Sequence, residues 1–206
     1  MTRLYAAAAA AVVAAILGGS AYWVYSNRAN DPYADCRGGV VGGGDIGGPF
    51  TLVDQTGATV TDKEVITKPS LIYFGYTFCP DVCPMDSARN AEAVDILEER
   101  GFEVTPVFIS IDPARDTPDI LAEFTGNLHP LMIGLTGSAQ QVKAASQAYK
   151  TYYKKQDGDS EFYLMDHSTF TYLVLPEQGF ADFFKRETTA AEMADRVGCF
   201  LNAPGA

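Results

Sequence analysis

Two cysteines stand four residues apart in "YFGYTFCPDVCP" (residues 73–84), just after an apolar run and just before a predicted helix. Pro84 suits the first position of a helix, so we expect Cys83 at or next to the N-cap. Unpaired backbone N–H groups and the positive end of the helix dipole stabilise a thiolate at that position. Cys79 and Cys83 could therefore form a structural disulfide, act as a redox pair, or bind a metal ion.

The spacing of the pair separates these possibilities only in part. Redox pairs of the thioredoxin type have two residues between the cysteines, whereas this pair has three. The extra residue leaves room for an ion between the sulfurs and favours metal binding, although a disulfide is still geometrically possible. Asp81 lies inside the loop and is interpreted as a solvated turn residue; contact with a basic partner is the alternative.

A third metal ligand can be sought among two histidines only. We interpret His129, at the end of a short predicted helix, as a loop or capping residue. His167 directly precedes a predicted strand and is the predicted third ligand; an ordinary surface histidine is the alternative. Asp166 could orient the imidazole from outside the ligand set, or simply enter the strand as a turn residue. Met85 and Met165 flank the site and are interpreted as packing residues.

The elements that must position these residues follow the order of the thioredoxin fold, an α/β fold, here with an inserted β-hairpin. The apolar runs and helical spacings predict a hairpin over 50–60, buried strands over 70–76, 104–111 and 131–137, and helices over 84–100, 118–126 and 138–149. A second hairpin with its tip at 157–158, two strands around 176–179 and a closing helix over 188–201 complete the pattern.

Three segments, "GYTFCPDVCP", "IDPARDTP" and "DHSTFTYLV", occur in the order seen in the Sco/SenC family of copper proteins, which includes PrrC-like factors for cytochrome c oxidase assembly. The resemblance runs from about residue 50 to 201 and includes the N-terminal apolar segment. It implies a thioredoxin-like fold that binds one copper ion, Cu(I) or Cu(II), through Cys79, Cys83 and His167. Many members have a histidine where this chain has Phe78.

The resemblance implies a copper-binding metallochaperone or thiol reductant that helps to assemble the dinuclear copper centre of cytochrome c oxidase subunit II. The expected partner is that subunit or another copper chaperone. One alternative is a thiol–disulfide oxidoreductase, or weak peroxidase, with Cys79 and Cys83 as attacking and resolving thiols. A copper or redox sensor is a further alternative. We expect "IDPARDTP" to be structural, with Asp116 or Thr117 capping the helix that begins at Pro118.

The remaining cysteines, Cys36 and Cys199, are left as a possible structural disulfide if the other two hold metal. Two free thiols are the alternative. The pair would tie the segment before the domain to the last helix.

The N-terminal part is expected to be a cytoplasmic end over residues 1–3, a single transmembrane anchor over 4–25, and a glycine-rich flexible linker over 26–48. A cleaved signal peptide is the alternative to the anchor. The copper-binding domain is expected over 49–206, in the periplasm of a bacterium whose inner membrane holds the chain. A net charge of −11 argues against a nucleic-acid partner, because phosphates bind basic surfaces.

Overall fold

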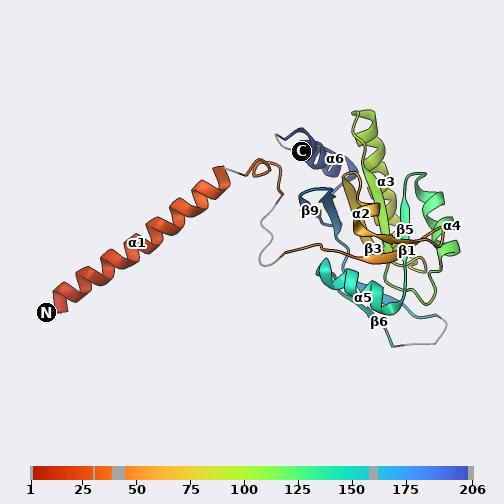
Figure 1. The fold of residues 1–206 in the computed structure, drawn as a ribbon, viewed down its shortest axis with the longest axis horizontal. Helices are drawn as coiled ribbons and strands as arrows, with labels where there is room; N and C mark the ends of the chain where they lie inside the picture. Colours follow the sequence, from red (N-terminus) through yellow and green to blue (C-terminus); the bar gives the residue numbers. More distant parts are fainter. Residues whose placement is uncertain (1, 30, 39–44, 158–161, 204–206) are drawn as a thin grey trace.

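A seven-stranded mixed sheet forms the centre of the domain, in the order β2-β1-β5-β4-β3-β8-β9 (Figure 1). The computed structural model describes residues 2–29, 31–38, 45–157 and 162–203. The strands of this sheet are β1 (Thr51–Asp54), β2 (Thr59–Thr61), β3 (Ser70–Gly75), β4 (Thr105–Ser110), β5 (Ile133–Thr136), β8 (Thr171–Leu175) and β9 (Gly179–Phe184).

The helices are α1 (Thr2–Ala29), α2 (Asp62–Val65), α3 (Val82–Glu99), α4 (Pro118–Leu128), α5 (Ala139–Ala148) and α6 (Ala190–Asn202). Strand β3 is buried along its whole length and pairs in parallel with β4, so the chain between them must cross over the sheet. Helix α3 makes that crossover. The cysteine loop follows β3 directly and is thereby fixed to the most buried strand of the domain.

The alternation of side chains along β3 divides the core into two layers. Leu71 packs with Leu97 and Phe200 from α3 and α6, which lie together on one face of the sheet. Its neighbour on the strand, Ile72, belongs to the second cluster. There Phe74 packs at 5.4 Å from the ring of Tyr149, which follows α5. One sheet with a core layer and helices on each face is the predicted thioredoxin-like α/β fold.

The inserted hairpin forms a separate two-stranded sheet from β6 (Tyr153–Lys155) and β7 (Met165–His167). Tyr153 pairs with His167 and Lys155 pairs with Met165. Asp157 is described, but Gly158, the other residue of the predicted tip, lies outside the described residues. The hairpin therefore carries His167 at its base.

The N-terminal helix α1 extends away from the domain (Figure 1). In the part of the chain that the structure describes, no helix is both long and apolar enough to cross a membrane. The anchor over residues 4–25 therefore stays a prediction.

The segment after α1 differs from the predicted flexible linker. Tyr33 and Cys36 are buried in the α3–α6 core layer. Cys36 forms a disulfide with Cys199 of α6, with 5.5 Å between the Cα atoms. The ring of Tyr33 lies 5.3 Å from that of Phe200. Residues 31–38 thus belong to the domain because a disulfide and aromatic packing hold them; residues 39–44 lie outside the described residues.

Candidate metal centre

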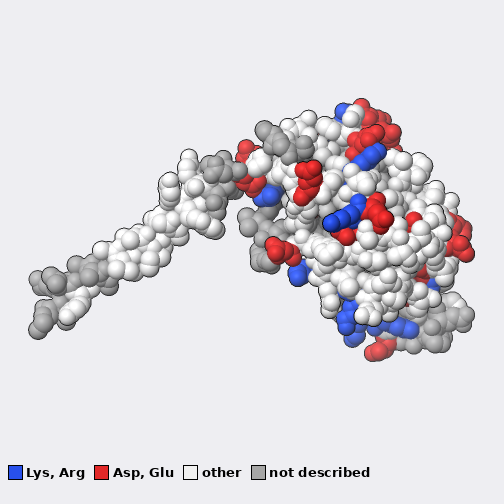
Figure 2. Space-filling view, in the orientation of Figure 1, with Lys and Arg blue, Asp and Glu red and all other residues white. Residues whose placement is uncertain are grey.

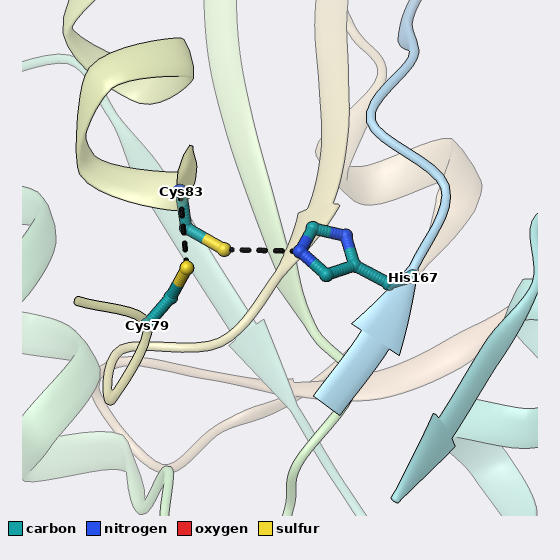
Figure 3. A group of neighbouring side chains, drawn as sticks. All are labelled: Cys79, Cys83 and His167. Atoms are coloured by element: carbon teal, nitrogen blue, oxygen red, sulfur yellow. Dashed lines mark hydrogen bonds between the residues drawn. The ribbon is translucent and has the colours of Figure 1, made fainter. Parts of the chain in front are cut away.

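The side chains of Cys79, Cys83 and His167 converge near the C-terminal end of the interior strand β3 (Figure 3). Their ligand atoms all lie within 4.8 Å of one another. Cys83 Sγ is 3.3 Å from His167 Nε2. The backbone N–H of Cys83 donates to Cys79 Sγ at 3.3 Å. The structure thus brings together all three residues that the sequence predicts as ligands.

The start of helix α3 lies two residues earlier than the sequence predicts. The N-cap is Asp81, whose side chain makes no capping hydrogen bond, and Pro84 occupies the third helical position instead of the first. Cys83 therefore lies inside the first turn. The sulfur of Cys79 accepts one of the N–H groups that the start of a helix leaves unpaired.

The thiol whose pKa is lowered is not the one that the sequence placed at the start of the helix. Burial opposes ionisation of Cys79, but hydrogen bonds from the backbone of Asp81, Cys83 and Val82 outweigh it and lower the pKa of this thiol below its usual value. Burial dominates at Cys83 and raises the pKa of its thiol well above the usual value. Cys79, and not the predicted Cys83, is the thiol that ionises more readily.

The imidazole of His167 is held with one nitrogen free to bind a metal. Its Nδ1 lies 2.8 Å from the backbone carbonyl oxygen of Ser168, and because a carbonyl only accepts, Nδ1 carries the proton. Nε2 therefore keeps its lone pair and points at Cys83 (Figure 3). The ring stands edge-on to Tyr73 and Tyr76, at 6.2 and 5.8 Å between centroids. Burial lowers the pKa of His167, which favours the neutral, metal-binding form.

One of the two interpretations of Asp166 from the sequence was that it orients the imidazole. In the structure it does not. Its Oδ1 accepts a hydrogen bond from Gln156 Nε2 at 2.6 Å on the exposed side of the hairpin. Asp166 acts on His167 only as a nearby charge that favours the protonated ring. The alternation of β7 puts the two side chains on opposite faces. No feature of the sequence indicates that the backbone of Ser168 supplies the hydrogen bond.

The other residues considered from the sequence lie outside the ligand set. His129 caps the C-terminal end of α4, with Nε2 3.2 Å from Asp95 Oδ1 and Nδ1 accepting from the backbone N–H of Leu131. Met85 is exposed and Met165 is buried in the core. His129 and Met165 thus have the structural roles that the sequence indicated, whereas the packing role predicted for Met85 is wrong.

Tyr73, Asp86 and Arg89 form a polar and aromatic layer next to Cys83, which the sequence did not reveal. The hydroxyl of Tyr73 donates to the buried carboxylate of Asp86 at 3.1 Å, and Asp86 also faces Arg89 at 3.6 Å. A Cβ atom on Gly75 would lie 3.1 Å from Cys83 Sγ and 2.8 Å from a ring carbon of Tyr73. Glycine at the end of β3 therefore lets this thiol and ring approach the strand closely.

The "IDPARDTP" segment braces the cysteine loop. The buried carboxylate of Asp116 accepts hydrogen bonds from the backbone N–H and the hydroxyl of Thr77, at 3.1 and 2.6 Å, and from the hydroxyl of Ser110 at 2.5 Å. The N-cap of α4 is Thr117, whose side chain makes no capping hydrogen bond. The segment is structural, as expected, but Asp116 fixes the loop and does not cap the helix.

The donor set fits a soft metal ion. Two thiols and one neutral imidazole are the ligands that Cu(I) and zinc prefer, and the imidazole also makes Cu(II) tolerable. Three protein ligands leave a coordination position for a further ligand. The site can therefore both hold such an ion and accept a partner's donor atom.

Comparison with known proteins places these features in one family. Residues 40–202 match the SCO1/SenC family model. The chain is 55% identical to Protein SenC of Rhodobacter capsulatus over 203 residues, which are 98% of this chain and 92% of that protein.

Two solved structures are similar as well. Arabidopsis thaliana ScoI with copper bound is 41% identical with a TM-score of 0.71, covering 74% of this chain and 95% of that one. Yeast Sco1 with copper bound is 36% identical with a TM-score of 0.72, covering 79% and 92%. The chain, with its two cysteines and one histidine in place, belongs to the SCO1/SenC family.

Proposed function

We propose that this chain binds one copper ion through Cys79, Cys83 and His167 and serves in the assembly of cytochrome c oxidase. The observation that carries the proposal is the convergence of three ligand atoms within 4.8 Å from a helix start and a distant hairpin. The two relatives above whose structures hold copper support the choice of metal.

The three ligand residues contribute to copper binding in different ways. Cys79, with its lowered pKa, presents a thiolate first. Cys83 must lose its proton when the metal binds, so binding releases protons and weakens as the pH falls. His167 supplies Nε2 as a neutral donor and is needed most by Cu(II), because two thiolates already satisfy Cu(I). The open position admits a donor atom of the recipient before these ligands leave.

The proposed recipient is the dinuclear copper centre of cytochrome c oxidase subunit II, or another copper chaperone upstream of it. Family membership supports this partner, and the site suits two roles at the same target. The chain could deliver copper, or it could reduce the cysteines of that centre so that they can bind copper. A sensor that reports copper or redox state to a membrane partner would use the same three ligands.

A second function, thiol–disulfide exchange, is favoured by the difference between the two thiol pKa values. The Cys79 thiolate would attack a partner disulfide and form a mixed disulfide. Cys83 would then attack Cys79 Sγ, release the second partner thiol and leave a Cys79–Cys83 disulfide. Two electrons pass to the partner, and the chain must later be reduced by another dithiol. This exchange has no need of His167 as a ligand.

We also propose that α1 anchors the chain in a bacterial inner membrane with the domain in the periplasm. Residues 4–25 contain no charged residue, and Figure 2 shows no red or blue atoms on the part of α1 that is not grey. The Cys36–Cys199 disulfide suits an oxidising compartment. Fractionation of cells, followed by carbonate extraction, should leave the chain in the membrane pellet; recovery in the soluble fraction would contradict the anchor.

The decisive experiment compares copper binding by the reduced full chain with that by His167→Ala and by His129→Ala, the matched control. Cu(I) is followed by competition with a chelator and Cu(II) by the sulfur-to-copper charge-transfer absorption. We expect one copper per chain, with the Cu(II) band lost in His167→Ala and kept in His129→Ala. Binding indifferent to His167, or no binding by the wild type, would place thiol–disulfide exchange first.

A further inference from the structure

The two halves of the metal site are supported very differently. Cys79 and Cys83 lie between β3 and α3, and both belong to the core cluster, with Cys83 completely buried. His167 lies on a two-stranded hairpin, and an isolated hairpin of this kind is only marginally stable in water. Something outside the hairpin must therefore fix the distance between the imidazole and the thiols.

Arg115 connects the hairpin to the cysteine loop. Its Nη1 donates to the backbone carbonyl of Tyr163 at 3.0 Å, and its guanidinium carbon lies 3.6 Å from the centre of the Tyr163 ring. The same guanidinium lies 4.8 Å from the ring of Phe78 and 5.7 Å from the ring of Tyr76. Phe78 directly precedes Cys79, and Tyr163 lies four residues before His167.

Asp112 fixes the arginine and the tyrosine together. Its Oδ2 pairs with Arg115 Nε at 2.5 Å, and its Oδ1 accepts from the hydroxyl of Tyr163 at 2.7 Å. Lys155 of β6 places its Nζ 3.5 Å from the centre of the Tyr163 ring. We call Asp112, Arg115 and Tyr163 the arginine clasp. The side chain of Arg115 is 14% exposed, so these contacts are largely shielded from water.

The hairpin has further links near the ligand, because Met165 is buried in the core and the His167 ring stands edge-on to Tyr73 and Tyr76. The backbone N–H of Met165 donates to the hydroxyl of Tyr76 at 3.3 Å, a long hydrogen bond. The clasp contributes shorter hydrogen bonds and an arginine–tyrosine stack, and both kinds of contact are stronger when they are shielded from water. The clasp thus provides shorter hydrogen bonds to the hairpin segment than the Tyr76 hydroxyl does.

We propose that Arg115 is a positioning residue of the copper site, which holds His167 against the cysteine pair through the clasp. The inference rests on the proposed copper binding and adds to it a residue that is not a ligand. Loss of the clasp would free the hairpin and remove the imidazole from the site while the thiols stay in place. Affinity for Cu(II), which needs the imidazole, would fall; affinity for Cu(I), which two thiolates hold, would change little.

The planar guanidinium is essential to this role. Lysine keeps the positive charge but cannot lie flat between two rings while it donates to both Asp112 and Tyr163. Arg115→Lys therefore tests the geometry of the clasp apart from its charge. Tyr163→Leu removes the stacking ring from the other side. Arg100→Gln, which breaks a surface ion pair with Asp195, is the matched control.

The experiment measures Cu(II) and Cu(I) binding by the full chain and these three variants, with cupric chloride and a chelator-buffered Cu(I) solution as probes. We expect Cu(II) affinity to fall about 10- to 100-fold in Arg115→Lys and Tyr163→Leu, the range seen when groups that orient ligands are removed. The charge-transfer band should move toward that of His167→Ala. Cu(I) affinity should stay within about threefold of the wild type, because both thiols remain.

The outcomes separate this inference from the proposed function. No copper binding by the wild type defeats the proposed function itself. A wild type that binds copper, with Arg115→Lys and Tyr163→Leu unchanged in Cu(II) affinity and band position, defeats the inference alone. An equal loss of Cu(I) and Cu(II) affinity in both variants also defeats it, because the clasp would then support the whole fold.

Discussion

The Nε2 atom of His167 lies 3.3 Å from the Sγ atom of Cys83, across 84 residues of sequence. The contact joins the base of the β6–β7 hairpin to the first turn of α3. The site therefore forms only when these two elements, which are distant in the sequence, pack against each other. The contacts that hold this short distance are therefore open to test by substitution.

The two thiols should react at different rates with iodoacetamide in the metal-free, reduced protein. The lowered pKa of Cys79 means that its thiolate forms at a lower pH than that of a model thiol, so its alkylation should rise with pH through a lower midpoint. Cys83 is fully buried, with a raised pKa, and should remain unmodified through neutral pH. Peptide mass spectrometry gives both rates. Equal rates would contradict the assignment, and the Cys83→Ser variant serves as control.

Gly75→Ala should disturb the site and the core together. The added Cβ would lie 2.8 Å from Tyr73 Cε1, 2.9 Å from Phe108 Cε2 and 3.1 Å from Cys83 Sγ. Overpacking of this kind lowers the free energy of unfolding by about 1–3 kcal/mol, which urea denaturation measures. Copper affinity should fall as well, because Cys83 is displaced.

The control for that substitution is Gly126→Ala in α4, where nothing lies within 4 Å of the new Cβ. There alanine should stabilise the helix by up to about 1 kcal/mol. A Gly75→Ala protein as stable as the wild type would show that the ring and the thiol move aside at no cost.

Removal of the Cys36–Cys199 disulfide should destabilise the domain. The bond closes a loop with a sequence separation of 163 residues, and the loss of such a disulfide costs about 2–5 kcal/mol. The Cys36→Ser, Cys199→Ser double variant should unfold at lower denaturant concentration than the oxidised wild type. Reductant should lower the midpoint of the wild type only. A non-reducing peptide map that shows both thiols free would refute the bond directly.

Asp116→Asn should loosen the cysteine loop. The carboxylate accepts three hydrogen bonds from Thr77 and Ser110, and an amide would turn an N–H₂ group toward one of these donors. An unsatisfied buried group of this kind costs about 1–3 kcal/mol. Denaturant unfolding measures the loss, and alkylation of Cys79 should become faster.

The exposed Asp119, in the first turn of α4, provides the matched control. Asp119→Asn should leave both unfolding and alkylation unchanged. If Asp116→Asn behaves in the same way, the hydrogen bonds to Thr77 do not hold the loop.

Local sequence patterns were sufficient to predict most of the helices and strands. The apolar runs around Ile72 and Phe108 predict β3 and β4 within two residues, and the spacing of Val94 and Leu97 predicts α3. The predicted start of α3 lies two residues too late because Pro84 suits several positions of a first turn. The position of β1 beside β5 depends on contacts between distant segments, which no local pattern contains.

The site was predictable as far as side-chain type carries chemistry. Thiols and imidazoles bind metals, so Cys79, Cys83 and His167 stand out in the sequence. The groups that position them do not: the carbonyl of Ser168 belongs to the backbone, and Arg115 acts through the ring of a tyrosine 48 residues away. Such roles arise from tertiary packing and become visible only in three dimensions.

The disulfide and the metal-binding thiols lie in different layers of the domain. Cys36 and Cys199 pack with the C-terminal half of α3, near Leu97, while Cys83 lies in its first turn. A rise of 1.5 Å per residue puts about 20 Å between Cys83 and Leu97 along the helix. Thiol–disulfide exchange requires direct contact between sulfur atoms. The length of α3 therefore keeps the two cysteine pairs too far apart to exchange. One chain can thus keep an oxidised pair and a reduced pair in the same compartment without scrambling them.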